Sequence, residues 1–119
     1  MNELAKKIHE NAIRHGFYDN KRETGTLLML CVSELSEALE ADRKNIRADL
    51  NAFDSSCNVG ESFNGAFERT IKDTFEDEIA DTIIRLLDLC GYYNIDIDEH
   101  IRLKMKYNEM RQHMHGKSY

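Results

Sequence analysis

No proline occurs among the 119 residues of the chain. Because proline is the strongest breaker of helices, its absence allows long uninterrupted helical segments. Apolar residues recur at helical spacing in four segments, at about 2–14, 23–43, 70–93 and 98–115. No segment shows a reliable strand period, so the sequence predicts an all-α, four-helix bundle-like fold. The length of the chain indicates a single domain over residues 1–119.

The second and third segments carry the longest apolar stripes. The stripe of the second consists of Leu27, Leu28, Cys31, Leu35, Ala38 and Leu39, and that of the third of Ile79, Ala80, Ile83, Leu86, Leu87 and Cys90. Gly16 follows the first helix as a C-cap, and Asp96 or Asp98 is placed to cap the fourth. These residues predict both the buried faces and the ends of the helices.

Residues 44–68 have a different composition. They include the stretch SSCNVGESFNG, which is rich in serine, asparagine and glycine, and they contain Phe53, Phe63 and Phe67. Such a composition predicts a loop insertion, in which the apolar residues favour a short helix or a docked edge. Loops of this length in small domains are often functional.

Composition limits the classes of partner and the compartment. Charged residues make up 32% of the chain and the net charge is −6, so neither a nucleic acid polymer nor a membrane surface is an expected partner. The N-terminal residues are amphipathic and charged, unlike a secretory leader, and no apolar run approaches the roughly 20 residues that span a bilayer. The three cysteines form no disulfide or zinc pattern, and Cys31 and Cys90 lie in apolar stripes as buried thiols. These features predict a cytoplasmic protein.

Two carboxylates intrude on the apolar face of the second helix. With Cys31 at zero and about 100° per residue, Glu34 falls at about −60° and Glu37 at about −120°. Glu34 therefore lies within the apolar sector and Glu37 at its edge. An ionised carboxylate in such a place is costly unless a cation meets it.

A second acidic pair, Glu78 and Asp81, has the same spacing in the third helix, opposite the apolar stripe. Either pair alone is typical of an ordinary solvated helix face. Together, the four carboxylates can converge between two helices as a site of hard oxygen ligands. No histidine or cysteine set accompanies them, so the chemistry favours Mg²⁺, with Mn²⁺ as a substitute, over zinc.

The fourth helix carries a line of polar and cationic side chains. With Lys104 at zero, Asn108 falls at about +40°, Arg111 at about −20° and His115 at about +20°, in the middle of a half-buried face. Two interpretations remain open. The cations pair with the acids of the other helices, or they hold a phosphate chain beside a metal ion.

These residues resemble the motifs of the MazG-like all-α nucleoside triphosphate pyrophosphohydrolases. The pattern E-x-x-E followed by E-x-x-D reads Glu34-Leu35-Ser36-Glu37 and Glu78-Ile79-Ala80-Asp81. The later pattern K-M-x-x-N-x-x-R is matched by Lys104, Met105, Asn108 and Arg111, and the closing HGKSY is similar to a tail of that family. The resemblance covers nearly the whole chain apart from residues 44–68.

The resemblance implies a function. It assigns the four acids to Mg²⁺, and Lys104, Asn108 and Arg111 to the phosphates of a nucleoside triphosphate. Water would attack the α-phosphorus to give a nucleoside monophosphate and pyrophosphate, with the protein acting as a homodimer or homotetramer. His9, Phe17 and Tyr18, in and after the first helix, are candidates for holding the base. The alternative is that His9 is a surface or interface residue and that Phe17 or Tyr18 belongs to the core.

Several alternatives remain open at this point. Either Glu34 or Glu37 is the general base, because Ser33 stands where the family often has a further glutamate. The substrate class also admits a specialised relative, such as a dUTPase-like enzyme or a phosphoribosyl-ATP pyrophosphatase. The rival from another class is a non-catalytic helical interaction protein that retains the bundle.

Overall fold

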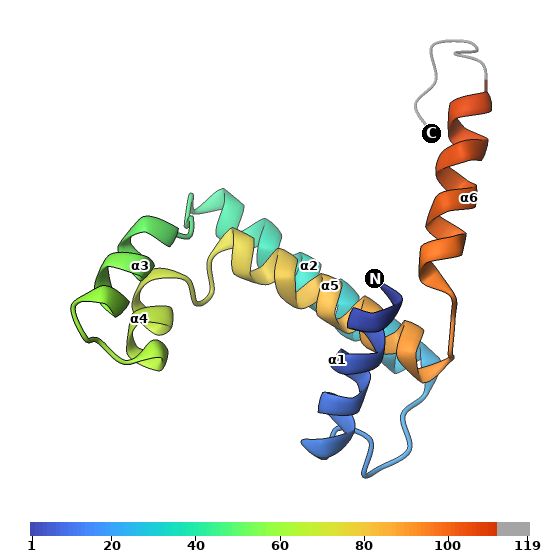
Figure 1. Ribbon diagram of the computed structural model, residues 1–119, viewed down its shortest axis with the longest axis horizontal. Coiled ribbons are helices and arrows are strands. Elements are labelled where there is room, and N and C mark those ends of the chain that lie inside the picture. Colours follow the sequence, from blue (N-terminus) through green and yellow to red (C-terminus); the bar gives the residue numbers. More distant parts are fainter. Residues whose placement is uncertain (112–119) are drawn as a thin grey trace. The chain divides into compact units, whose positions relative to one another are not determined.

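The computed structural model describes residues 1–111, and this part of the chain contains helices and no strands (Figure 1). The prediction of an all-α protein is thereby confirmed. The helices are α1 (Asn2–Arg14), α2 (Thr24–Arg43), α3 (Leu50–Asn58), α4 (Phe63–Thr70), α5 (Phe75–Tyr92) and α6 (Ile97–Met110). None of them, within the described residues, has the length and apolar content that a membrane crossing requires.

The contacts divide the chain into two compact units. The first consists of Met1–Asp19 and Leu87–Tyr119, and the second of Asn20–Leu86. The first therefore holds α1, the end of α5 and α6, whereas the second holds α2, α3, α4 and the greater part of α5. Residues 112–119, which include His115 and the HGKSY tail, lie outside the described residues.

A small apolar core holds the first unit together. Ala5 on α1 packs with Leu87 and Cys90 on α5, and the partly buried Ile8 and Ile97 cover this group. Helix α1 ends as its sequence predicts. Gly16 follows the C-cap in a left-handed conformation, with φ 83°, and the N–H of Phe17 donates to the carbonyl of Ala12.

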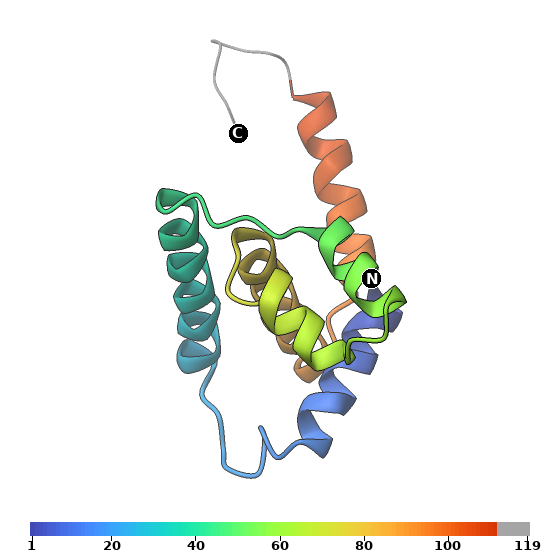
Figure 2. The ribbon, with the colours of Figure 1, turned by 90° about the vertical axis from the view of Figure 1, so that its left-hand side faces the viewer.

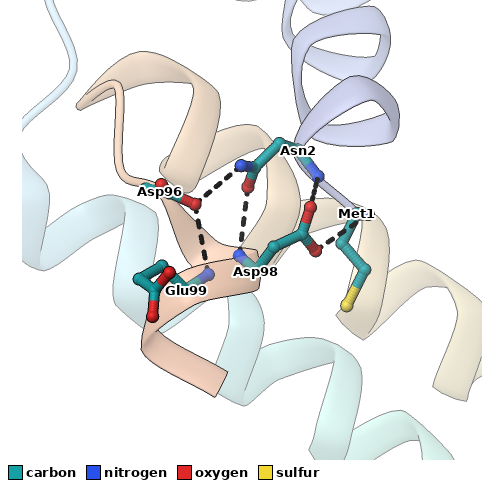
Figure 3. Close-up of polar contacts among 5 residues, drawn as sticks. All are labelled: Met1, Asn2, Asp96, Asp98 and Glu99. Carbon is teal, nitrogen blue, oxygen red and sulfur yellow. Dashed lines mark hydrogen bonds and ion pairs between the residues drawn. The ribbon is translucent and has the colours of Figure 1, made fainter. Parts of the chain in front are cut away.

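Reciprocal polar contacts fasten the start of α6 to the start of α1 (Figure 3). The Asp96 side chain accepts from the N–H of Glu99 as the N-cap of α6, and it also accepts from the Asn2 amide at 2.7 Å. The backbone N–H groups of Asn2 and Asp98 each donate to the side chain of the other, at 3.0 and 3.1 Å. The structure thus selects Asp96 as the capping residue.

In the second unit, α2 lies along the adjacent part of α5 (Figures 1 and 2). The face of α2 turned inward contains the buried Leu27, Cys31, Ala38 and Ala41, spaced by four, seven and three residues. Glu34 falls midway in this series, four residues before Ala38 and three after Cys31, and is half-buried. The predicted intrusion of Glu34 on the apolar face of its helix is therefore present.

The segment 44–68 is largely helical and not the predicted loop. Helices α3 and α4 are capped at their N-termini by Asp49 and Ser62, whose side chains accept from the N–H groups of Ala52 and Gly65. The rings of Phe53 and Phe67 each contact Phe63, with centroids 5.5 and 6.0 Å apart. The contact of Phe53 with Phe63 joins the two short helices into a hairpin that a loop-like composition does not reveal.

The orientation of α5 also differs from the prediction. Leu87 and Cys90 of the predicted stripe are buried, but Ile83 and Leu86 are 45% and 43% exposed, whereas Glu78 is only 5% exposed. Within the second unit, the side of α5 that meets α2 is the polar one. Periodicity identified the two faces of the helix, and the position of α2 decided which face was covered.

A candidate metal centre

The second unit brings three of the predicted carboxylates together. Glu34 comes from α2, and Glu78 and Asp81 come from the first two turns of α5. One ligand oxygen from each lies within 4.8 Å of the other two. The i,i+3 spacing puts Glu78 and Asp81 on one side of α5, so that the neighbouring helix can supply the third oxygen.

Glu78 is the most buried member of this acid cluster. Its Oε2 atom is fully buried and has no hydrogen-bond partner within the described chain. Burial raises the pKa of Glu78 to about 8, together with the neighbouring carboxylates of Glu37 and Glu34, which can accept a hydrogen bond from its protonated form only, and the negative charges of Glu37 and Asp81. A buried carboxylate oxygen that lacks a partner is costly, and a bound cation would relieve that cost.

The pKa values of the other two members, Glu34 and Asp81, are shifted in opposite directions. Burial acts to raise the pKa of Glu34, but hydrogen bonds, first among them one from Arg85, lower it below its usual value. Arg85 Nε donates to Glu34 Oε1 at 2.9 Å. Burial and the charges of Asp77 and Glu34 raise the pKa of Asp81. The pKa values of Glu78 and Asp81 are thus shifted in the direction expected where like charges meet with too little compensation.

Glu37 lies beside the cluster and is exposed. Its hydrogen bond and charge both act on Glu78, although it is not one of the three residues with mutually close oxygens. A cleft of about 380 Å³ opens here. Its lining includes Glu37, Glu78, Glu40, Ala41, Lys44, Ile46 and Asp73. The first acidic motif thus divides into a half-buried member, Glu34, and a member that faces solvent, Glu37.

The donor set fits a hard divalent cation. Carboxylate oxygens from neighbouring helices are the ligands that Mg²⁺ and Mn²⁺ prefer, and the described part of the chain brings no histidine or cysteine into the group. A second acidic group, Asp73, Asp77 and Glu78, shares one member with the first. Asp77 there already accepts from the N–H of Asp73 at 2.9 Å, a contact that orders the start of α5.

The predicted phosphate ligands belong to the first unit. Asn108 is half-buried, but Lys104 is exposed, contrary to the predicted half-buried line, and no residue of α6 is fully buried. Lys104 and Arg111 share a side, since both cations approach the ring of Tyr107, at 5.2 and 5.7 Å from its centroid. Arg111 is the C-cap of α6 and not part of a longer helix.

The predicted base-binding residues also lie in the first unit, around a buried aspartate. His9 Nδ1 lies 2.8 Å from Asp88 Oδ1, and the Tyr18 hydroxyl donates to Asp88 Oδ2 at 2.6 Å. The ring of Tyr18 contacts His9 edge-on at 4.9 Å and stacks on Tyr92 at 5.1 Å. Phe17 adjoins this group, with its ring 5.0 Å from that of Tyr18.

Sequence reasoning missed two polar residues, Arg85 and Asp88. Both carried a signal. Arg85 follows Glu78 by seven residues and Asp81 by four, which places it on their side of α5. Asp88 interrupts the apolar run LLDLC, where an unpartnered carboxylate is unfavourable.

No model of a protein family matches the chain, and neither the curated proteins nor the solved structures contain a significant match. The resemblance to MazG-like enzymes therefore rests on the motifs alone.

Proposed function

We propose that the protein is a Mg²⁺-dependent nucleoside triphosphate pyrophosphohydrolase, which converts a nucleoside triphosphate to the monophosphate and pyrophosphate. The observation that carries the proposal is the acid cluster of Glu34, Glu78 and Asp81, with its buried and unpartnered Glu78 oxygen. These three residues would hold Mg²⁺, or Mn²⁺ in its place, with Glu37 beside them. The bound cation would supply Lewis-acid polarisation of the phosphoryl oxygens.

Glu37 is our choice as the general base. Glu34 is bonded to Arg85 and belongs to the group of three close oxygens, whereas Glu37 is exposed beside that group. A carboxylate in this position can accept a proton from an attacking water. The roles of Lys104, Asn108 and Arg111 at the phosphates, and of His9 and Tyr18 at the base, rest on the motif resemblance. The role of Phe17 at the base rests on the same resemblance, and its ring contacts that of Tyr18.

Product analysis tests the reaction. The purified protein is incubated with Mg²⁺ and each common ribo- and deoxyribonucleoside triphosphate, and the products are separated by chromatography. We expect monophosphate and pyrophosphate, and the ranking of bases distinguishes a general enzyme from a dUTPase-like or phosphoribosyl-ATP-specific one when those substrates are included. Diphosphate and orthophosphate would instead place the cut at the terminal phosphate.

Substitutions then test the acid cluster. Glu34→Gln and Asp81→Asn are expected to reduce turnover by at least about a hundredfold, on the scale of losing an essential charged group, while the helical circular dichroism is unchanged. Glu68→Gln is the matched control, because this exposed glutamate on α4 lies outside the cluster. Near wild-type turnover in both cluster variants would refute the assignment. Absence of turnover with every substrate would favour the non-catalytic interaction protein.

A further inference from the structure

Arg85 lies at the acid cluster, although no motif assigns it a role. It extends from the same side of α5 as Glu78 and Asp81, and its Nε reaches across to Glu34 on α2. The Arg85 side chain is 34% exposed and that of Glu34 is 13% exposed. The Arg85 side chain therefore contacts the acid cluster and is also partly accessible to solvent.

The contact places a positive charge directly on Glu34, because Arg85 Nε donates to Glu34 Oε1 at 2.9 Å. A guanidinium group is a planar fork that fits a carboxylate and never loses its proton. Arg85 thus supplies positive charge at the place where the three acid oxygens converge.

A divalent cation on this cluster would need the same glutamate. Glu34 is one of the three residues whose oxygens lie mutually close, and its Oε1 is already occupied by Arg85 Nε. Two cations on one partly buried carboxylate repel each other more strongly than they would in water. The arginine contact and a metal ion are therefore in competition.

We propose that Arg85 is the built-in cation of the metal-free state, and that a divalent cation binds Glu34, Glu78 and Asp81 by displacing the Arg85 guanidinium from Glu34. The inference rests on the metal site within the proposed function and not on the hydrolysis of any nucleotide. When no metal is bound, the positive charge of Arg85 reduces the repulsion between the converging acids in the folded protein. The same charge weakens the affinity of the cluster for metal.

Titration with Mn²⁺ in the absence of nucleotide tests the competition. Arg85→Gln is expected to bind Mn²⁺ at least about fivefold more tightly than the wild type, which is the lower end of typical coupling between two binding events. Arg69→Gln is the matched control. It removes the same charge from the same unit, but Arg69 pairs with Glu61 in the α3–α4 hairpin. Its affinity is expected to remain within about twofold of wild type, whereas equal affinities of Arg85→Gln and wild type would overturn the proposal.

A second experiment uses the wild-type protein, so that its result does not depend on whether a variant folds. The arginine Nε–H resonances are followed by ¹⁵N-edited NMR during addition of Mg²⁺, and Arg85→Lys identifies the Arg85 signal by its loss. We expect the Arg85 signal to shift and to exchange faster with water as metal binds, while the signal of Arg69 stays in place. Metal binding with an unchanged Arg85 signal would overturn the displacement.

The outcomes separate this inference from the proposed function. If neither wild type nor Arg85→Gln binds metal, both the site and the displacement fail. If only Arg85→Gln binds detectably, the competition is supported in its strongest form. Metal binding with displacement of Arg85 but without hydrolysis of any nucleotide would support the inference and overturn the proposed reaction alone.

Discussion

At the scale of single residues, the environment of Glu78 sets the chemistry of the acid cluster. The carboxyl group is 5% exposed, adjoins other acids and has one oxygen without a partner in the described chain. Its pKa is raised to about 8, from a usual value of 4.5. Glu78 is therefore expected to carry a proton at neutral pH, and the metal ion of the proposed function would have to displace that proton.

The pH dependence of stability follows from this shift. Between about pH 4.5 and 8 the folded protein holds a proton on Glu78 that the unfolded chain has lost. The resulting stabilisation is fully present below the lower value and is lost as pH rises through the higher one, by at most about 1.4 kcal/mol per pH unit. We expect Glu78→Gln, which cannot ionise, to show a weaker fall in the free energy of unfolding over this window.

Urea unfolding in the presence of a chelator, at intervals from pH 5 to pH 9, measures this difference. The comparison is between the slopes of the two proteins, because other groups titrate in both. Parallel slopes for the wild type and Glu78→Gln would contradict the raised pKa.

At the scale of helices, the packing of α1 on the end of α5 depends on a close approach at Gly91. A Cβ atom at this position would lie 2.6 Å from the Cβ of His9 and 2.9 Å from the carbonyl oxygen of Ala5. Neither atom is the far end of a flexible side chain, so the helices would have to move apart. The same contact keeps His9 within reach of Asp88.

Gly91→Ala is therefore expected to destabilise the protein by about 1–3 kcal/mol, the usual cost of overpacking. Gly25→Ala on α2 is the matched control, because a Cβ atom there meets nothing within 4 Å. It should be neutral or stabilising by up to about 1 kcal/mol, since alanine favours helix over glycine. Chemical denaturation measures both, and equal effects of the two substitutions would show that the close contact is absent.

At the scale of the whole molecule, α2 bears an apolar stripe in addition to its buried one. Leu28, Val32, Leu35 and Leu39 follow one another at intervals of four, three and four residues, and each is between 45% and 50% exposed. This is the spacing with which helices pair along a seam. A continuous apolar stripe of this kind marks an interaction surface, and we propose that it contributes to a homodimer or homotetramer.

Val32→Glu is expected to shift the protein toward the monomer by placing a charge in the middle of this stripe. Thr26→Glu adds the same charge at an exposed position on the opposite side of α2 and should leave the assembly unchanged. Sedimentation velocity measures the mass of each. A monomeric wild type, or an oligomer that tolerates Val32→Glu, would contradict this use of the surface.

The sequence by itself determined the features that depend on local spacing. The absence of proline and the period of the apolar residues gave the helical class, and the bounds of α1 and α2 were predicted to within a residue. Capping chemistry limited the N-cap of α6 to Asp96 or Asp98, and helical angles placed Glu34 on an apolar face beside its buried neighbours. Each of these follows from the geometry of one helix.

Only the tertiary structure decided which face of each helix is covered and by what. It covered the acidic side of α5 with α2, left Ile83 exposed, and paired Arg85 with Glu34, which lies 51 residues earlier in the chain. It also gathered the phenylalanines of residues 44–68 into a helical hairpin. The physical reason is that the period of a helix fixes the angles between its own side chains, whereas burial and ion pairing depend on neighbours that are distant in sequence.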